Sequence, residues 1–271
     1  MDITSVTGFR FARTRDDLAL APGEVVMGGG TWLMSEPQPG TTGFVDLMTL
    51  GWPDVEVSAA GLRIGATCTI ASLLAWTDAD APADWTARSI VPDAANALLA
   101  SFKIWNTATV GGNIARSFAA GAMVSLAVAL DGVAEIWTPD GGAREEPVAS
   151  FVTGNGTNTL APGEVLRAVR LPAHALRSRA RLRKIALAEL GRSGAVVTGR
   201  VDADGGAVFG ITAATVTPTV LRFRTLPTAG ELADAVTTAS GYYTDPLGSA
   251  DWRRGVSRVL AEQIRTELAA T

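Results

Sequence analysis

The most informative segment of the sequence is Val25-Val26-Met27-Gly28-Gly29-Gly30-Thr31-Trp32-Leu33, a short apolar strand that enters three glycines and then the expected start of a helix. Consecutive glycines permit positive φ angles and let backbone N–H groups approach an anion without a Cβ in the way. Thr31 adds a hydroxyl donor. Such a turn suits the phosphates of a nucleotide, although a triple glycine taken alone is explained first by a tight strand-to-helix turn.

A second turn of similar composition, Thr109-Val110-Gly111-Gly112-Asn113, has a glycine pair between two side-chain donors. Neither turn matches a common nucleotide motif, because a Rossmann motif would need glycine where Leu33 stands and a P-loop would need Gly-Lys-Ser/Thr. A structural turn explains the second segment about as well when it is considered alone. Together, the two turns favour a dinucleotide held from two sides.

Composition excludes several kinds of chemistry. The 271 residues include one cysteine, Cys68, and one histidine, His174, with a formal net charge of −4. An iron–sulfur cluster, a Cys/His zinc site or a disulfide framework cannot be built within this chain. A Ser-His-Asp hydrolase is disfavoured because the Gly-x-Ser-x-Gly elbow is absent. The slight acidity gives no footprint for nucleic acid. We expect a cytoplasmic protein, since we find neither a signal-peptide pattern nor an apolar run of about 18 residues.

Apolar strand-like segments alternate with helical ones, which predicts an α+β class. In the first half we expect strands at 25–27, 44–46, 55–57 and 62–64, and helices after Thr69 and over 92–99 and 120–130. After a boundary near residue 175 we expect an antiparallel meander of strands at 180–188, 195–201, 207–215 and 220–223, and then helices at 228–239 and 251–269. The last helix carries an apolar stripe of Val256, Val259, Leu260, Ile264 and Leu268.

The paired turns resemble the two FAD-pyrophosphate motifs of the flavoprotein (medium) subunits of molybdenum hydroxylases. The carbon monoxide dehydrogenase medium subunit and the flavin domain of xanthine dehydrogenase belong to that family. The resemblance covers nearly the whole chain. Further similar segments are Ile64-Gly65-Ala66-Thr67-Cys68-Thr69, Pro162-Gly163-Glu164-Val165-Leu166 and Ser249-Ala250-Asp251-Trp252-Arg253-Arg254.

The resemblance implies an FAD-binding domain of the vanillyl-alcohol-oxidase (PCMH) type over 1–174, with lobes at about 1–52 and 53–174. A C-terminal domain of the CO dehydrogenase flavoprotein type would follow over 175–271, built from a three- or four-stranded antiparallel sheet with helices. It also implies an oxidoreductase subunit. Electrons would come from 2Fe–2S clusters on a small subunit, which a molybdopterin site on a large subunit reduces. They would pass through non-covalent FAD to an external acceptor.

The resemblance further implies which residues hold FAD, and it places no catalytic or metal-binding residue on this chain. The implied set is Met27, Gly28, Gly29, Gly30, Thr31, Trp32, Leu33, Thr67, Asn106, Thr109, Gly111, Gly112, Asn113, Leu166 and Lys184.

The sequence also departs from the family. The loop over 115–123 carries no carboxylate, with alanine at Ala122, whereas many relatives have an aspartate-containing loop there. The position before Asn106, where the family usually has an aromatic or basic residue, is Trp105. The family's Lys-x-x-Arg-x-x-Asp pattern is only partly present between Lys184 and Ser193. These departures bear on ribityl contacts and on the electron acceptor. Two alternatives stay open: a stand-alone flavin oxidase or reductase of the same superfamily, and a flavin-free scaffold subunit.

Three other features have simple interpretations. Arg177, Arg179, Arg181 and Arg183 alternate, so on a strand they would share one face. That face either docks an acidic partner or phosphates, or protects a solvated sheet edge. Cys68 is expected to be a buried small apolar residue, and His174 a surface residue that does not attach flavin covalently.

Overall fold

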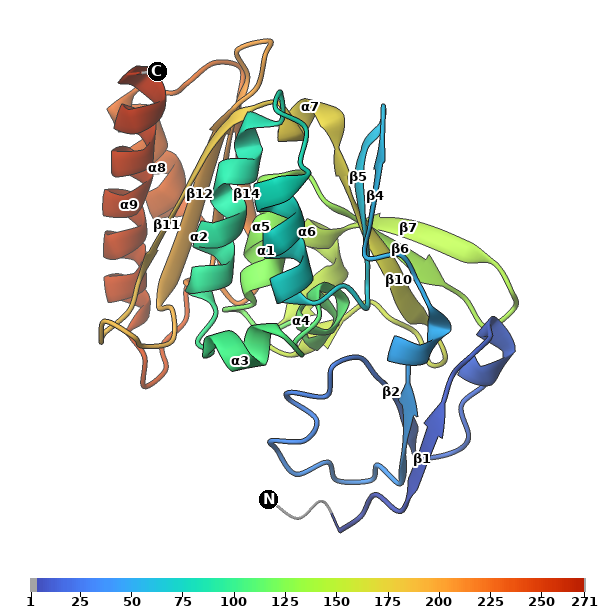
Figure 1. Cartoon of the computed structure of the whole chain (residues 1–271). Helices are drawn as coiled ribbons and strands as arrows, with labels where there is room; N and C mark the ends of the chain where they lie inside the picture. The colour runs from blue at the N-terminus through green and yellow to red at the C-terminus, as the bar shows by residue number, and fades with distance from the viewer. Residues whose placement is uncertain (1–3, 271) are drawn as a thin grey trace.

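The computed structural model describes residues 4–270 and contains three main sheets that follow one another along the chain (Figure 1). They occupy residues 8–46, 55–172 and 179–223. Strands β8 (Val152–Gly154) and β9 (Thr157–Asn158) form an additional small hairpin. Mixed helices and sheets confirm the α+β class. Within residues 4–270, none of the helices has the length and apolar character needed to cross a membrane.

The first sheet is small and parallel, with β3 between the other two strands. Its elements are β1 (Gly8–Phe11), η1 (Arg15–Leu18), β2 (Glu24–Met27), β3 (Gly43–Asp46) and η2 (Met48–Leu50). The predicted helix after Gly30 is wrong, because residues 31–35 form only turns, closed by the Met34 N–H donating to the Gly30 carbonyl at 2.8 Å. Pro37 follows too soon for a second helical turn.

The second sheet is antiparallel, in the order β4-β5-β10-β6-β7. Its strands are β4 (Val55–Ser58), β5 (Gly61–Gly65), β6 (Val133–Trp137), β7 (Ala143–Pro147) and β10 (Val165–Pro172). The helices along this stretch are α1 (Ile70–Ala79), η3 (Thr86–Ser89), α2 (Ile90–Ala97), α3 (Phe102–Trp105), α4 (Val110–Arg116), α5 (Ala122–Ala129), α6 (Val148–Phe151) and α7 (Ala173–Leu176).

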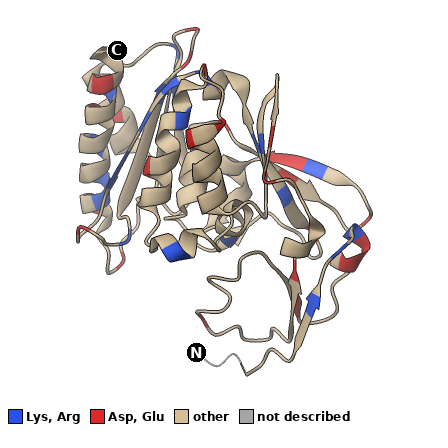
Figure 2. Ribbon diagram, viewed as in Figure 1, with Lys and Arg blue, Asp and Glu red and all other residues tan. Residues whose placement is uncertain are grey.

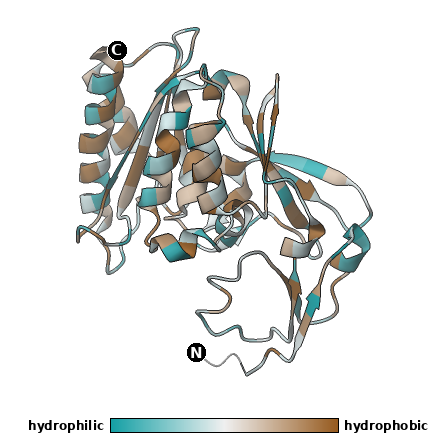
Figure 3. Ribbon diagram, in the orientation of Figure 1, coloured by the Kyte–Doolittle hydropathy of each residue, from teal (hydrophilic) through white to brown (hydrophobic). Residues whose placement is uncertain are grey.

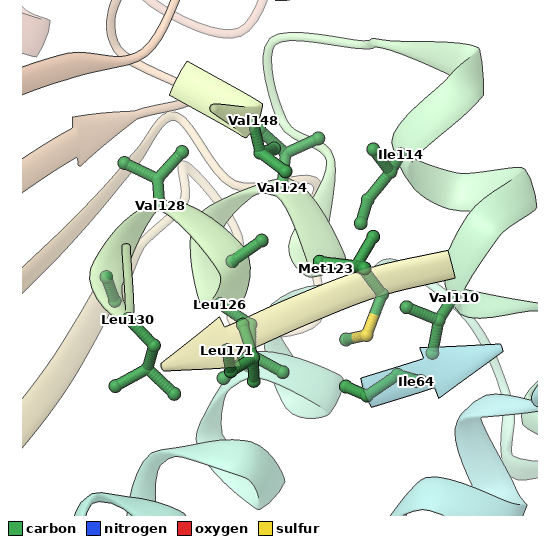
Figure 4. Close-up of a cluster of buried hydrophobic side chains, with 14 of the residues drawn as sticks. Ile64, Val110, Ile114, Met123, Val124, Leu126, Val128, Leu130, Val148 and Leu171 are labelled. Atoms are coloured by element: carbon green, nitrogen blue, oxygen red, sulfur yellow. The ribbon is translucent and has the colours of Figure 1, made fainter. Parts of the chain in front are cut away.

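Helix α5 forms the centre of the core, as its nearly uniform apolar sequence predicts. All eight of its residues are buried. Figure 4 shows Met123 of α5 pointing toward Val110 of α4 and Ile64 of β5, and all three belong to one hydrophobic cluster. The hydroxyls of Ser125 and Thr212 lie 2.6 Å apart, which joins α5 to the third sheet. The second and third sheets therefore share a core.

The third sheet has four antiparallel strands in sequence order. They are β11 (Arg179–Ile185), β12 (Ala195–Val201), β13 (Ala207–Thr212) and β14 (Thr219–Phe223). Helices α8 (Ala229–Thr238) and α9 (Ala250–Ala270) cover one face of this sheet (Figure 1).

The apolar stripe predicted for α9 is correct except at Val259. Leu260, Ile264 and Leu268 are buried, whereas Val259 is 56% exposed. Residues four apart form the row that faces the sheet, and Val259 lies about 100° around the helix from Leu260. Figure 3 shows hydrophobic and hydrophilic residues interspersed along α9, as expected for a helix with one buried face.

The alternating arginines share a face, as predicted, but that face contacts α9. Arg179 donates to the carbonyl of Leu268 at 2.8 Å, and both Arg181 and Arg183 pair with Glu267. Arg177 precedes the strand and pairs with Asp84 instead. The charged row of edge strand β11 therefore holds the last helix against the sheet.

Candidate functional site

The two glycine turns meet in the structure. A Cβ on Gly28 would lie 2.8 Å from Oγ1 of Thr109, and a Cβ on Gly29 would overlap the carbonyl group of Thr107. Only residues without a side chain let the end of β2 pack this closely against the segment that leads into α4. The tertiary fold thus brings the two predicted motifs to one place.

The first turn presents a run of backbone donors without protein acceptors. Across residues 4–270, no hydrogen bond is donated by any of the six N–H groups of residues 28–33. All six residues are partly exposed, and Gly30 has a φ angle of 67°. Successive unpaired N–H groups form concavities that bind anions. The first turn therefore has the donor set for an acceptor-rich, anionic group.

The second turn uses its donors within the protein. Oγ1 of Thr109 accepts from the N–H of Gly112 at 3.0 Å and caps α4. The N–H of Val110 donates to Cys68 at 2.8 Å, and the N–H of Gly111 donates to Ala66 at 3.0 Å. These bonds tie the start of α4 to the segment between β5 and α1. The second turn is a rigid support with an exposed surface at Gly112.

Asn113 and Asn106 have structural partners of their own. The side-chain oxygen of Asn113 accepts from the Met123 N–H at 2.8 Å, which joins α4 to α5. The side-chain amide of Asn106 donates to the Phe102 carbonyl at 3.1 Å, and its residue is exposed. Just upstream, the buried indole N–H of Trp105 finds no acceptor among residues 4–270.

The remaining predicted residues, Met27, Thr67, Leu166 and Lys184, are buried or lie in another part of the structure. Met27 is buried, and its sulfur would lie 3.0 Å from a Cβ added to Gly30. Thr67 is buried in the segment between β5 and α1. Leu166 lies inside the core cluster, and Lys184 lines a groove with Asp93 and other residues of α2 and α9. No hydrogen bond, ion pair or ring contact within residues 4–270 joins Leu166 or Lys184 to either turn, and their contact with FAD stays a prediction.

The surroundings of the turns carry little negative charge. Neither turn contains a carboxylate, and Figure 2 shows the loop after β2 almost free of charged residues. Arg116, at the end of α4, lies against Trp32 of the first turn, with 3.8 Å between the guanidinium carbon and the ring centroid. Sequence reasoning missed Arg116 and Phe118. The available signal was a basic residue in the loop over 115–123, which contains no carboxylate.

The chain matches a family model over more than half of its length and solved structures over nearly all of it. Residues 14–174 match the family model described as FAD binding domain in molybdopterin dehydrogenase. A search of curated protein sequences finds no match. Among solved structures, the chain is similar to quinoline 2-oxidoreductase from Pseudomonas putida 86, with a TM-score of 0.81 and 20% identity over 100% of this chain and 99% of that one.

Chains of two carbon monoxide dehydrogenases are similar in structure to this chain to the same degree. The reconstituted enzyme from Oligotropha carboxidovorans has a TM-score of 0.82 and 20% identity, covering 98% of this chain and 99% of that chain. The enzyme from Hydrogenophaga pseudoflava that lacks the Mo-pyranopterin moiety has a TM-score of 0.81 and 19% identity, covering 100% and 99%. At these identities the likeness shows the fold, and it confirms the expected one.

Proposed function

Because this chain belongs to the family of FAD-binding domains of molybdopterin dehydrogenases, we propose that it is the FAD-binding subunit of a heteromeric molybdenum hydroxylase. In this role it receives electrons from the iron–sulfur clusters of a small partner subunit, which a large molybdopterin subunit reduces. It passes them through FAD to an external acceptor. Residues 1–174 would hold the cofactor, and residues 175–271 would complete the subunit.

The run of unpaired N–H groups at residues 28–33 carries this proposal. A dinucleotide diphosphate offers the negatively charged oxygens that such a run requires. The Thr31 hydroxyl adds a side-chain donor, while Thr109, Gly111 and Asn113 hold the opposing surface in place. The residues present therefore fit FAD, because they supply donors on one side and a support without carboxylates on the other.

The protein and the cofactor have separate tasks in this proposal. Bound flavin supplies the electron-transfer chemistry, and the chain supplies binding and orientation. The single thiol does not take part, because burial raises the pKa of Cys68 to about 12 and keeps it protonated at neutral pH. The metal ligands that this chain lacks would be provided by its partners.

Titration of the purified chain with FAD tests the proposal. We expect saturable quenching of flavin fluorescence at one FAD per chain, with free FAD recovered after denaturation because attachment is non-covalent. Riboflavin, which lacks the diphosphate, should bind more weakly. A chain that takes up no FAD, although it is folded by circular dichroism, would contradict the proposal.

A flavin-free scaffold is the second candidate, because the resemblance implies a carboxylate in the loop over 115–123 and this chain has none there. Co-purification distinguishes the possibilities. A colourless chain that still assembles with molybdenum and iron–sulfur subunits would support the scaffold. An FAD-loaded chain that oxidises a substrate without partner subunits would instead support a stand-alone oxidase.

A further inference from the structure

Arg116 is held by aromatic rings from two separate loops. Its guanidinium carbon lies 3.8 Å from the ring centroid of Trp32 and 4.1 Å from that of Phe118. The two rings are 6.0 Å apart and inclined at 72° to each other. Arg192, from the loop after β11, approaches the Phe118 ring at 5.4 Å. Loops from all three sheet regions thus converge on one cationic and aromatic cluster.

No carboxylate neutralises Arg116 within residues 4–270. Its buried Nε has no hydrogen-bond acceptor, and its one hydrogen bond is a long one from Nη1 to the Gly156 carbonyl at 3.4 Å. The buried Arg200 and Arg253 both pair with aspartates, whereas the buried Arg167 resembles Arg116 in stacking on a tryptophan and leaving one side-chain nitrogen, Nη1, without a partner. Leaving a partly buried cation unpaired is costly, so this arrangement suits a negatively charged group that arrives from outside the chain.

The unpaired cation and the unpaired backbone donors occupy the same place. Trp32, which stacks on Arg116, is itself one of the residues whose N–H lacks an acceptor. The nearby loop over 115–123 contains no aspartate or glutamate, so no acidic residue of that loop is available to pair with the guanidinium. Both features call for an anionic, acceptor-rich ligand on this side of the first turn.

We propose that Arg116 is an additional cofactor-binding residue, which donates to FAD bound at the first turn, and that Trp32 and Phe118 position its guanidinium. This inference rests on the proposed function. Arginine suits the task because its planar guanidinium stacks on aromatic rings and still presents N–H groups at its edge. The group on FAD that accepts from Arg116 is either the diphosphate or the polar edge of the flavin ring, since both accept hydrogen bonds.

Binding measurements on the full chain test the inference. Dissociation constants for FAD, ADP and riboflavin are measured for the wild type, Arg116→Met, Arg116→Lys and the matched control Arg15→Met. Arg15 also stacks on a tryptophan, Trp137 at 4.5 Å, but belongs to η1 rather than to this cluster. We expect Arg116→Met to weaken FAD binding about tenfold to a hundredfold, as loss of a charge-assisted hydrogen bond does.

The expected pattern is specific. Arg116→Lys should recover part of the FAD affinity, and Arg15→Met should stay within twofold of the wild type. A loss for ADP assigns the contact to the diphosphate, and a loss for riboflavin alone assigns it to the ring. Thermal unfolding of the apo variants identifies any loss of fold, in which case Arg116→Lys gives the decisive affinity.

Two results would overturn the inference while leaving the proposed function intact. One is that the wild type binds FAD and the folded Arg116→Met variant binds it with the same affinity. The other is an equal loss in Arg15→Met. A wild-type chain that does not bind FAD would instead refute the proposed function and this inference with it.

Discussion

The first glycine turn leaves the N–H groups of residues 28–33 without acceptors in the part of the chain that the structure describes, residues 4–270. The second turn, at residues 109–113, uses its donors to cap α4 and to bond the segment before α1. The first lies at the end of a strand in a small parallel sheet and is partly exposed. The second is continuous with the main core through Val110 and Ile114.

This difference shows that similar glycine content serves two tasks. In the first turn, glycine allows close approach and exposes donors for a ligand. In the second, Gly111 allows the helix to pack against Ala66. Substitutions in the first turn should therefore reduce cofactor affinity, and substitutions in the second should reduce stability.

The largest effect is expected outside both turns, at Asp131. This residue pairs with the buried Arg200 and with Arg222 at 2.7 Å. We expect Asp131→Asn to lower the free energy of unfolding by about 3 kcal/mol, because it leaves Arg200 partly uncompensated. Asparagine keeps the shape and tolerates the φ angle of 50° at this position. Urea unfolding measures the loss, and the exposed pair Arg177–Asp84 gives a control, Asp84→Asn, that should lose less than about 1 kcal/mol.

Lowering the pH should destabilise the fold through protonation of Asp131. Burial raises the pKa of Asp131, but hydrogen bonds from Arg222 and Arg200 outweigh this effect and hold the pKa at about 2. The unfolded pKa is about 3.9, so the stability from this carboxylate is present above about pH 4 and is lost as pH falls toward 2. Neither turn has a carboxylate, so FAD release should coincide with unfolding. Release in a fully folded protein would break this prediction.

Gly111→Ala should destabilise the fold by about 2 kcal/mol, because its Cβ would lie 2.5 Å from the Ala66 Cα, which belongs to the backbone and cannot rotate away. Apo-protein urea unfolding measures this change. The matched control is Gly255→Ala in α9, where an added Cβ meets nothing within 4 Å. The control should gain about 0.5–1 kcal/mol from helix propensity. Equal stabilities for the two variants would argue against the supporting role of the second turn.

Gly29→Ala should act mainly on affinity. Its Cβ would lie 2.5 Å from the carbonyl carbon of Thr107, so the first turn must move away from the second. We expect FAD affinity to fall at least about tenfold, equivalent to about 1.4 kcal/mol. Fluorescence titration measures it, with Gly255→Ala as the control. If Gly29→Ala kept wild-type affinity, the unpaired donors of the first turn would not be the binding element.

Thr109→Ala should have the smallest effect, a loss of about 1 kcal/mol of stability, because it removes the hydroxyl that caps α4. Thr109→Ser, which keeps the hydroxyl, should restore most of this stability. FAD affinity should change less than in Gly29→Ala. A larger loss of affinity than of stability would show that Thr109 contacts the cofactor directly and would weaken the contrast between the turns.

Much of the local structure was predictable because its causes are local. Thr69 caps α1 as expected, accepting from the Ser72 N–H, and the uniformly apolar α5 is fully buried. The meander of the third sheet has the predicted strands in the predicted order. The predicted helix after Gly30 failed because the space before Pro37 allows only one turn, and boundaries of this kind depend on competing short-range effects.

The glycine turns, their flanking strands and caps, and the family follow from the sequence, since these depend on residue types at short spacing. Three features follow from the folded structure instead: Gly29 packs on Thr107, the donors of residues 28–33 stay unpaired within residues 4–270, and Arg116 lies against Trp32. Each of these contacts joins segments far apart in the chain. Their geometry is set by how the sheets pack around a common core, which a local pattern of residues does not specify.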